Sequence, residues 1–110
     1  MPSVSEVRPK IWDDVLDLYD DGTFSAIWGS REESESRELG VRWNGENGYV
    51  GYPNQGANPV WFSQPSFLEK AILLSLIGKL SANPALLRKD EFVMNILIAL
   101  QESNHSVGPA

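Results

Sequence analysis

The sequence predicts an α+β domain, with a small antiparallel sheet of about four strands, an N-terminal helix and two to three C-terminal helices packed on the sheet. Short aromatic segments bounded by turn residues follow one another between residues 23 and 63. No helical stretch separates them, which is typical of antiparallel strands joined by short connections. The last third of the chain then changes to apolar residues at helical spacing.

The first element is predicted to be a helix that ends near Gly22. Its apolar residues recur at the spacing of one helical stripe, and they are Trp12, Val15, Leu16 and Tyr19. Pro9 suits the first turn of a helix, and Gly22 suits the position after its end. The alternative is a β-hairpin in which segments 15–19 and 23–28 are joined through Asp21 and Gly22.

The sheet is predicted from four short segments, namely residues 23–28, 38–44, 49–52 and 59–63. In the second segment, apolar and polar positions alternate from Leu39 through Val41 to Trp43, as in a half-buried strand. Residues 29–38 contain no apolar side chain. They are therefore expected to form an exposed and mobile loop.

The C-terminal helices are predicted from capping residues and from apolar periodicity. Ser66 and Glu69 form the S-x-x-E pattern of a capping box, which begins a helix that runs to about Leu80. Further helix starts are expected at two residues that often cap helices, Asn83 and Asp90.

Both long helices carry apolar residues around most of their circumference. Such a helix needs burial on every side, but a domain of 110 residues has few elements that can cover it. The sequence therefore predicts a homodimer that is joined through these helices.

Composition and charge narrow the range of partners. The chain is one domain without cysteine, and its net charge is −6. Residues 1–40 hold four basic and ten acidic residues, whereas residues 41–110 hold five of each. This distribution argues against nucleic acid as a partner and permits a basic protein. No segment has the pattern of a signal peptide or of a membrane span, so a cytoplasmic protein without a membrane partner is predicted.

Catalytic and cofactor motifs are scarce. The only histidine, His105, lies in segment 103–110, which is expected to be a disordered tail. No glycine-rich phosphate motif occurs, so no catalytic residue, cofactor or metal ion is predicted. The carboxylates of Asp13, Asp17 and Asp20 (or Asp21) recur near helical spacing and would form an acidic ridge that binds a basic partner. A solvated helix face is the alternative.

The segment GYPNQGANPVWF, residues 51–62, combines aromatic and amide side chains with glycine and proline. Glycine and proline are typical of connections between strands. Aromatic rings beside polar groups are typical of small-molecule pockets and of interfaces. The candidate ligand-binding residues are Arg42, Tyr52, Asn54, Gln55 and Trp61. Packing of these residues in a core or an interface is the alternative.

The pattern LGVRWNG…GYPNQG…PVWF, followed by PSFLEKAILLSLIGKL, resembles small uncharacterised bacterial proteins encoded on mobile integron gene cassettes. The resemblance covers residues 38 to 80. It implies a bacterial cytoplasmic accessory protein and supplies neither a substrate nor a catalytic residue.

The function that these features favour is binding, of a partner or of a small molecule, by a small oligomeric protein. An acidic inhibitor or immunity-type protein that masks a basic partner through residues 13–38 is one alternative. A small enzyme that uses carboxylates in an aromatic pocket is the other.

Overall fold

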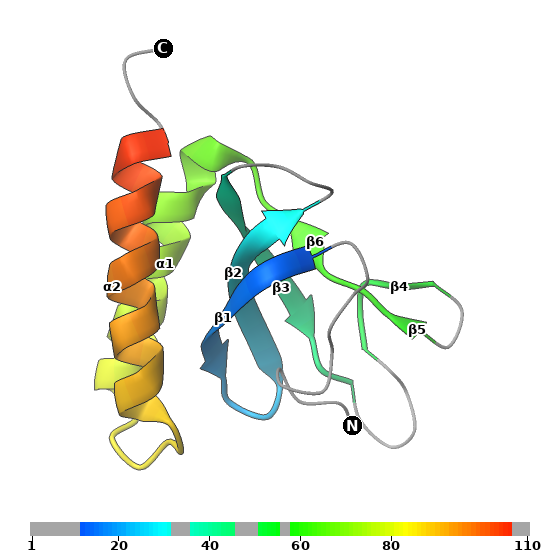
Figure 1. Cartoon of the computed structure of the whole chain (residues 1–110). Helices are drawn as coiled ribbons and strands as arrows, with labels where there is room; N and C mark the ends of the chain where they lie inside the picture. Colours follow the sequence, from blue (N-terminus) through cyan, green and yellow to red (C-terminus); the bar gives the residue numbers. More distant parts are fainter. Residues whose placement is uncertain (1–11, 32–35, 46–50, 56–57, 107–110) are drawn as a thin grey trace.

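Two helices pack on one face of a small antiparallel sheet (Figure 1). The structure is a computed structural model and describes residues 12–31, 36–45, 51–55 and 58–106. The strands are β1 (Trp12–Asp20), β2 (Phe24–Arg31), β3 (Arg37–Trp43), β4 (Asn54–Gln55), β5 (Asn58–Pro59) and β6 (Phe62–Ser63), and the helices are α1 (Ser66–Ser81) and α2 (Lys89–Ser106). The predicted α+β class is confirmed.

The main sheet has four strands in the order β1-β2-β3-β6, and each neighbouring pair is antiparallel. The short pair β4-β5 forms a separate sheet on the side away from the helices (Figure 1). Within the described residues, the predicted strand 49–52 contributes only an isolated bridge between Tyr52 and Trp43. Residues 49 and 50 lie outside the described residues. The fourth strand of the main sheet is instead β1.

The predicted N-terminal helix is wrong, because residues 12–20 form β1 and pair with β2. The turn between the two strands contains Gly22, whose φ of 91° is a conformation that glycine adopts without steric cost. Asp21 Oδ1 accepts hydrogen bonds from the N–H groups of Thr23 and Phe24, both at 2.9 Å. These bonds close the turn, as in the hairpin alternative.

Irregular pairing explains why the apolar pattern of β1 resembles that of a helix. The register of β1 on β2 shifts between Asp13 and Leu16, and again between Asp17 and Tyr19. Each extra residue at such an irregularity changes the face on which the next side chains lie. The apolar residues of β1 therefore depart from the period of two that identifies a regular strand.

The predicted loop 29–38 is shorter than expected, because its ends belong to strands. Gly29 pairs with Glu38, and Ser30 pairs with Arg37. Residues 32–35 lie outside the described residues.

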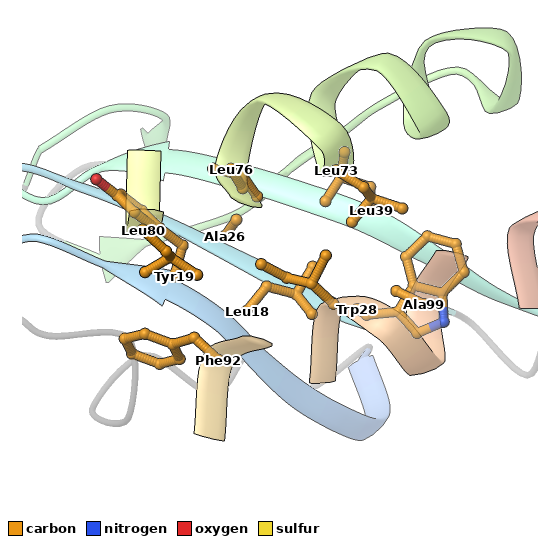
Figure 2. Packing of buried hydrophobic residues seen from close by; sticks show 11 residues of the cluster. Leu18, Tyr19, Ala26, Trp28, Leu39, Leu73, Leu76, Leu80, Phe92 and Ala99 are labelled. Atoms are coloured by element: carbon orange, nitrogen blue, oxygen red, sulfur yellow. The ribbon is translucent and has the colours of Figure 1, made fainter. Parts of the chain in front are cut away.

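The main core lies between the sheet and the helices (Figure 2). It combines side chains of β1, β2, β3 and both helices, and its buried members are Leu18, Tyr19, Ala26, Trp28, Leu39, Leu73, Leu76, Leu80, Phe92, Ile96 and Ala99. α1 contacts α2 and β3, and α2 contacts β1. The helices therefore cover one face of the sheet, which fits the expected packing of helices on the sheet.

A second cluster covers the opposite face of the sheet. Trp12, Ile27 and Trp61 are buried there, with Val15 packed against them. The indole of Trp12 lies so close to Gly40 that a Cβ atom at this position would be 2.9 Å from Trp12 Cη2. Glycine at position 40 therefore makes room for the tryptophan.

The helix ends differ from the predicted ones. Pro65 occupies the N-cap position of α1 and makes no side-chain capping bond, so the predicted capping box is absent. Residues 82–88 contain turns in place of a further helix beginning at Asn83, and α2 starts at Lys89. α2 continues to Ser106, so part of the expected tail is helical, and residues 107–110 lie outside the described residues.

Candidate ligand-binding site

An aromatic pair lies at the end of the sheet where β2 begins and β3 ends. Phe24 and Trp43 are register partners in β2 and β3. Their ring centroids are 4.9 Å apart, and the rings meet edge to face at 70°. The side chain of Trp43 is 54% exposed. Exposure of so large an apolar surface beside another aromatic ring is typical of a binding surface.

A cleft of about 520 Å³ lies between this pair and α1, and we call it the α1 cleft. Besides the aromatic pair, its walls include Tyr19, Asp21, Thr23, Ala71, Ile72, Ser75, Leu76 and Lys79. The α1 residues recur at helical spacing and form one side of the helix. Ala71 and Ser75 have short side chains, which leave room between α1 and Trp43. The volume is within the range of small-molecule sites.

Three polar residues of the α1 cleft, Tyr19, Asp21 and Thr23, lie at or beside the β1–β2 turn. The Tyr19 hydroxyl donates a hydrogen bond of 2.9 Å to Asp21 Oδ2. Burial and the neighbouring carboxylate of Asp21 raise the pKa of Tyr19 to about 12, so the phenol is neutral at physiological pH. Although burial acts to raise the pKa of Asp21, hydrogen bonds from the N–H groups of Phe24 and Thr23 keep it below its usual value. Asp21 is therefore ionised and already hydrogen-bonded within the chain.

Lys79 is the cationic group in the wall of the α1 cleft. Its ammonium interacts electrostatically with the carboxylate of Asp21. Within the part of the chain that the structure describes, Lys79 forms no ion pair at contact distance. A ligand bearing an anionic group can therefore contact this ammonium without breaking an ion pair.

A second cleft, of about 330 Å³, lies on the other side of the aromatic pair, and we call it the β6 cleft. Phe24 and Trp43 belong to both clefts. Tyr52 and Phe62 also line the β6 cleft, and they are 57% and 50% exposed. Tyr52 is held by two backbone hydrogen bonds to Trp43, of 2.7 and 3.1 Å, and Phe62 pairs with β3. Four separate segments thus bring four aromatic rings to one end of the sheet.

Arg42 and Trp61, two of the predicted ligand-binding residues, lie together and are buried. The guanidinium carbon of Arg42 is 5.9 Å from the centroid of the Trp61 ring, and Arg42 Nε donates a hydrogen bond of 3.1 Å to the carbonyl of Val60. Burial lowers the pKa of Arg42. Trp61 packs in the second core cluster, whereas Arg42 also contributes to the wall of the β6 cleft.

Of the other predicted ligand-binding residues, Tyr52 lies in the β6 cleft. Asn54 Nδ2 donates a hydrogen bond of 2.7 Å to the carbonyl of Gly51, so this amide stabilises the local turn. Gln55 belongs to β4, and its side chain lies outside the described residues. The structure therefore brings Arg42 and Tyr52 to one cleft.

The aspartates predicted to bind a partner are not arranged as a helical ridge, because they belong to β1. Asp13 is exposed. Asp17 is buried and forms an ion pair of 2.9 Å with Arg88. Asp20 Oδ1 accepts hydrogen bonds from the N–H of Gly22 and from Asn44 Nδ2. Asp17 and Asp20 therefore make contacts that stabilise the fold.

Glu69 joins three elements at the other end of the helical layer. Its carboxylate is buried, and it accepts hydrogen bonds from the Leu39 N–H at 3.3 Å and from the Ser103 hydroxyl at 3.5 Å. Burial is the largest influence and raises its pKa, and the nearby charge of Glu38 adds to this effect.

Glu102 connects α2 to the sheet close by. It accepts a hydrogen bond of 2.8 Å from Trp28 Nε1 and forms a bidentate ion pair with Arg37. The hydrogen bond from Arg37 is the main cause that lowers the pKa of Glu102. Neither glutamate lines the α1 or β6 cleft. These carboxylates therefore contribute no acid or base to the candidate site.

A third cleft, of about 590 Å³, lies between the β1–β2 turn and the connection of the two helices. Its polar groups include Asp20 and Arg88. Arg88 already pairs with Asp17 and Glu91, and Asp20 is hydrogen-bonded as described above. The aromatic residue in its wall, Phe92, is buried. This cleft therefore offers a ligand fewer contacts than the two clefts beside Trp43.

The sequence analysis did not identify Phe24, Trp43 and Lys79 as site residues. Trp43 continues the alternation of Leu39 and Val41, which predicts a side chain on the helix-covered face. It does lie on that face, but beyond the cover that α1 provides. The neighbouring turn residues Asn44 and Gly45 were a signal that the strand ends there.

Comparisons with protein-family models, with curated proteins and with solved structures give no match to this chain. Among residues 12–31, 36–45, 51–55 and 58–106, no group of three or more acidic or histidine side chains is placed to hold a metal ion. A search of the same residues finds no helix with the length and apolar character needed to cross a membrane.

Proposed function

We propose that this protein is a small homodimeric binding protein that takes a ligand in the α1 cleft and the adjoining β6 cleft. The observation that carries this proposal is the exposed Trp43 ring, which stands edge to face with Phe24 and separates two clefts that share both rings. Flat rings at the border of two clefts offer stacking surfaces to a planar apolar ligand.

The charges in the α1 cleft favour an anionic group on this ligand. Asp21 accepts three hydrogen bonds from the chain itself, from the Tyr19 hydroxyl and from two backbone N–H groups. Lys79 stands in the same wall and can donate to a ligand. The ligand class is therefore an organic anion with a planar apolar body.

The alternative of an acidic inhibitor has less support, because Asp17 and Asp20 are engaged within the fold. The alternative of a carboxylate-dependent enzyme would need two close carboxylates in a cleft, and Asp21 is the only carboxylate among the described residues that line the α1 and β6 clefts. The bacterial and cytoplasmic setting stays a prediction from the sequence.

A fluorescent probe of the proposed class tests this function. 8-Anilinonaphthalene-1-sulfonate has a planar apolar body and one anionic group. We expect saturable binding to the folded protein, and Trp43→Ala should weaken it at least about tenfold, since tenfold corresponds to about 1.4 kcal/mol. Leu97→Ala is a matched control, because Leu97 on α2 is 51% exposed and lies away from both clefts. Equal affinity of the Trp43→Ala variant would refute the site.

Lys79→Gln tests the role of charge. An exposed ion pair contributes about 0.2–1 kcal/mol, so the variant should bind the sulfonate probe up to roughly fivefold more weakly. N-phenyl-1-naphthylamine has the same ring system without the sulfonate, and its affinity should not change. An equal loss for both probes would show that Lys79 acts through the shape of the cleft and not through its charge.

A further inference from the structure

The outward face of α1 carries no charge. Its residues are Phe67, Ala71, Leu74, Ser75 and Gly78, and all of them are exposed. At 3.6 residues per turn these positions fall within about 100° of the helix circumference. The opposite side of α1 is buried against the sheet and α2 through Leu73, Leu76 and Leu80. A helix on the surface of a soluble domain normally has charged residues on its outward side, whereas the exposed lysines of α1, Lys70 and Lys79, lie at the two edges of this face. α1 therefore has a second, uncharged face that none of the described residues covers.

No contact among the described residues requires glycine at position 78. A Cβ atom at this position would meet nothing within 4 Å. Glycine in an exposed helix interior costs about 0.8–1.0 kcal/mol relative to alanine. The absence of a side chain is useful only where another backbone approaches closely. The open space around Gly78 therefore points to a helix outside this chain.

Large and small residues alternate along this face. Phe67, Ala71, Leu74 and Gly78 follow at steps of four, three and four residues, the spacing of a helix-to-helix seam. When two such helices run antiparallel, the large side chains of one helix can fit over the small ones of the other. A two-fold contact requires one surface that is complementary to itself, and this face supplies both kinds of position.

Charge opposes a second copy less on this face than on the acidic parts of the surface. Two chains of net charge −6 repel each other, and the outward face of α1 contains none of their acidic residues. Phe67 is 78% exposed, and Trp43 beyond the cleft is 54% exposed. With aromatic side chains of roughly 150–250 Å² each, these two rings alone expose roughly 200–300 Å². With Leu74 and Leu68 added, the exposed area is several hundred square ångströms per copy, which is at the lower end of the size range of specific interfaces.

We propose that two copies of this chain pack α1 against α1 antiparallel about a two-fold axis, and that each copy closes the α1 cleft of the other. Ala71 and Ser75 belong both to the outward face of α1 and to the wall of the α1 cleft. A partner helix seated along α1 therefore lies beside the opening of the cleft and supplies a further wall. The closure of the α1 cleft by the partner rests on the proposed ligand-binding function. It predicts that ligand binding and dimerisation strengthen each other.

Sedimentation equilibrium across the micromolar range tests the contact. The wild-type protein should sediment as a dimer of the 12.2 kDa chain. Leu74→Arg should give monomers, and Leu97→Arg on α2 should remain dimeric. These two variants are matched, because each leucine is 51% exposed on the outward side of its helix. A monomeric wild type, or a Leu97→Arg monomer with a Leu74→Arg dimer, would overturn the proposal.

Gly78→Arg keeps the test decisive if Leu74→Arg does not fold. Arginine is a better helix former than glycine, and its Cβ atom would meet nothing within 4 Å among the described residues. The variant should therefore be monomeric and should melt at a temperature at least as high as the wild-type monomer. A dimer of this variant with wild-type affinity would overturn the α1 contact.

The sulfonate probe separates the two halves of the proposal. In the monomeric variant it should bind about tenfold more weakly than in the wild-type dimer, if the partner closes the cleft. Unchanged affinity would refute closure and leave the ligand site intact. A wild-type dimer that depends on Leu74 but does not bind the probe would refute the proposed function and leave the α1 contact intact.

Discussion

Replacement of Gly40 by alanine should destabilise the face of the sheet opposite the helices. The new Cβ would lie 2.9 Å from Trp12 Cη2, 3.3 Å from Trp12 Cζ2 and 3.3 Å from Ile27 Cγ1. Carbon atoms pack best at about 3.5–4.0 Å, so the indole must move by roughly 0.6 Å or more. Trp12 is buried against Ile27 and Trp61, which limits that movement.

The expected cost follows from two opposing effects. Overpacking of a core costs about 1–3 kcal/mol. Alanine recovers about 0.5–1 kcal/mol, because glycine loses more conformational freedom on folding. The net loss for Gly40→Ala therefore lies between about 0 and 2.5 kcal/mol, with a central value of about 1 kcal/mol, which urea denaturation followed by circular dichroism can measure.

A double-mutant cycle with Trp12→Leu tests whether the indole is the cause. Leucine leaves room for the new methyl group, so Gly40→Ala should be neutral or stabilising in that background. The coupling between the two positions should be about 1–2 kcal/mol. If Gly40→Ala costs the same in both backgrounds, contact with Trp12 is not the reason for glycine at this position.

Two further predictions concern the carboxylates of Glu69 and Glu102, which have opposite pH dependence. Burial raises the pKa of Glu69, so its contribution to stability is fully present below the ordinary value of 4.5 and is lost as the pH rises through the raised folded value. Glu69→Gln retains both hydrogen bonds, because the amide oxygen can accept from the Leu39 N–H and the amide nitrogen can donate to the Ser103 hydroxyl. The free energy of unfolding of Glu69→Gln at neutral pH should therefore be at least that of the wild type, as measured by urea denaturation. A variant that is more stable than the wild type only in acid would contradict this prediction. The ion pair with Arg37 lowers the pKa of Glu102, so its contribution is present above 4.5 and is lost as the pH falls. Glu102→Gln should therefore lower the urea midpoint at neutral pH and change it little in acid, and an equal change at both would refute the role of the ion pair.

The two C-terminal helices were predictable because their signal is local. α1 and α2 contain long runs of residues that favour helices, and their apolar side chains recur on every side. The predicted starts at Ser66 and near Asp90 agree with the structure to within one residue. The predicted capping role of Glu69 was wrong, and its actual contacts were not predictable, because its carboxylate bonds to Leu39 and Ser103, which are distant in the sequence.

The strand at the start of the chain was not predictable from periodicity alone. Its two register shifts destroy the regular alternation, and Trp12 and Leu18 bury their side chains in different clusters. Spacing that fits one helical stripe therefore also fits a strand with irregular pairing. The turn residues Asp21 and Gly22 correctly indicated the β-hairpin, because they fit a hairpin turn better than the end of a helix.

The candidate site was predictable in part, since Tyr52 and Arg42 do reach one cleft. Its main feature, the exposure of Trp43, depends on where α1 stops covering the sheet. That position is set by the connection from β6 to α1 and by the tertiary packing of Leu73 and Leu76. A sequence pattern identifies the face on which Trp43 lies but not the extent of the helix that covers this face.

Ser75→Leu should affect ligand binding and dimerisation together, because Ser75 belongs to both surfaces. Ser75 is exposed, so a larger side chain meets open space in the cleft and leaves the main core unchanged. Leucine also favours the helix more than serine does, by less than about 0.7 kcal/mol, so the folded monomer should lose no stability. The leucine would fill the space between α1 and the Trp43 ring, and its bulk would hold a partner helix away from Gly78. We therefore expect a folded monomer that no longer binds the sulfonate probe, as measured by sedimentation equilibrium and by fluorescence titration. A variant that loses the probe but remains a dimer would separate the two surfaces, and the short side chain at position 75 would then serve the ligand alone.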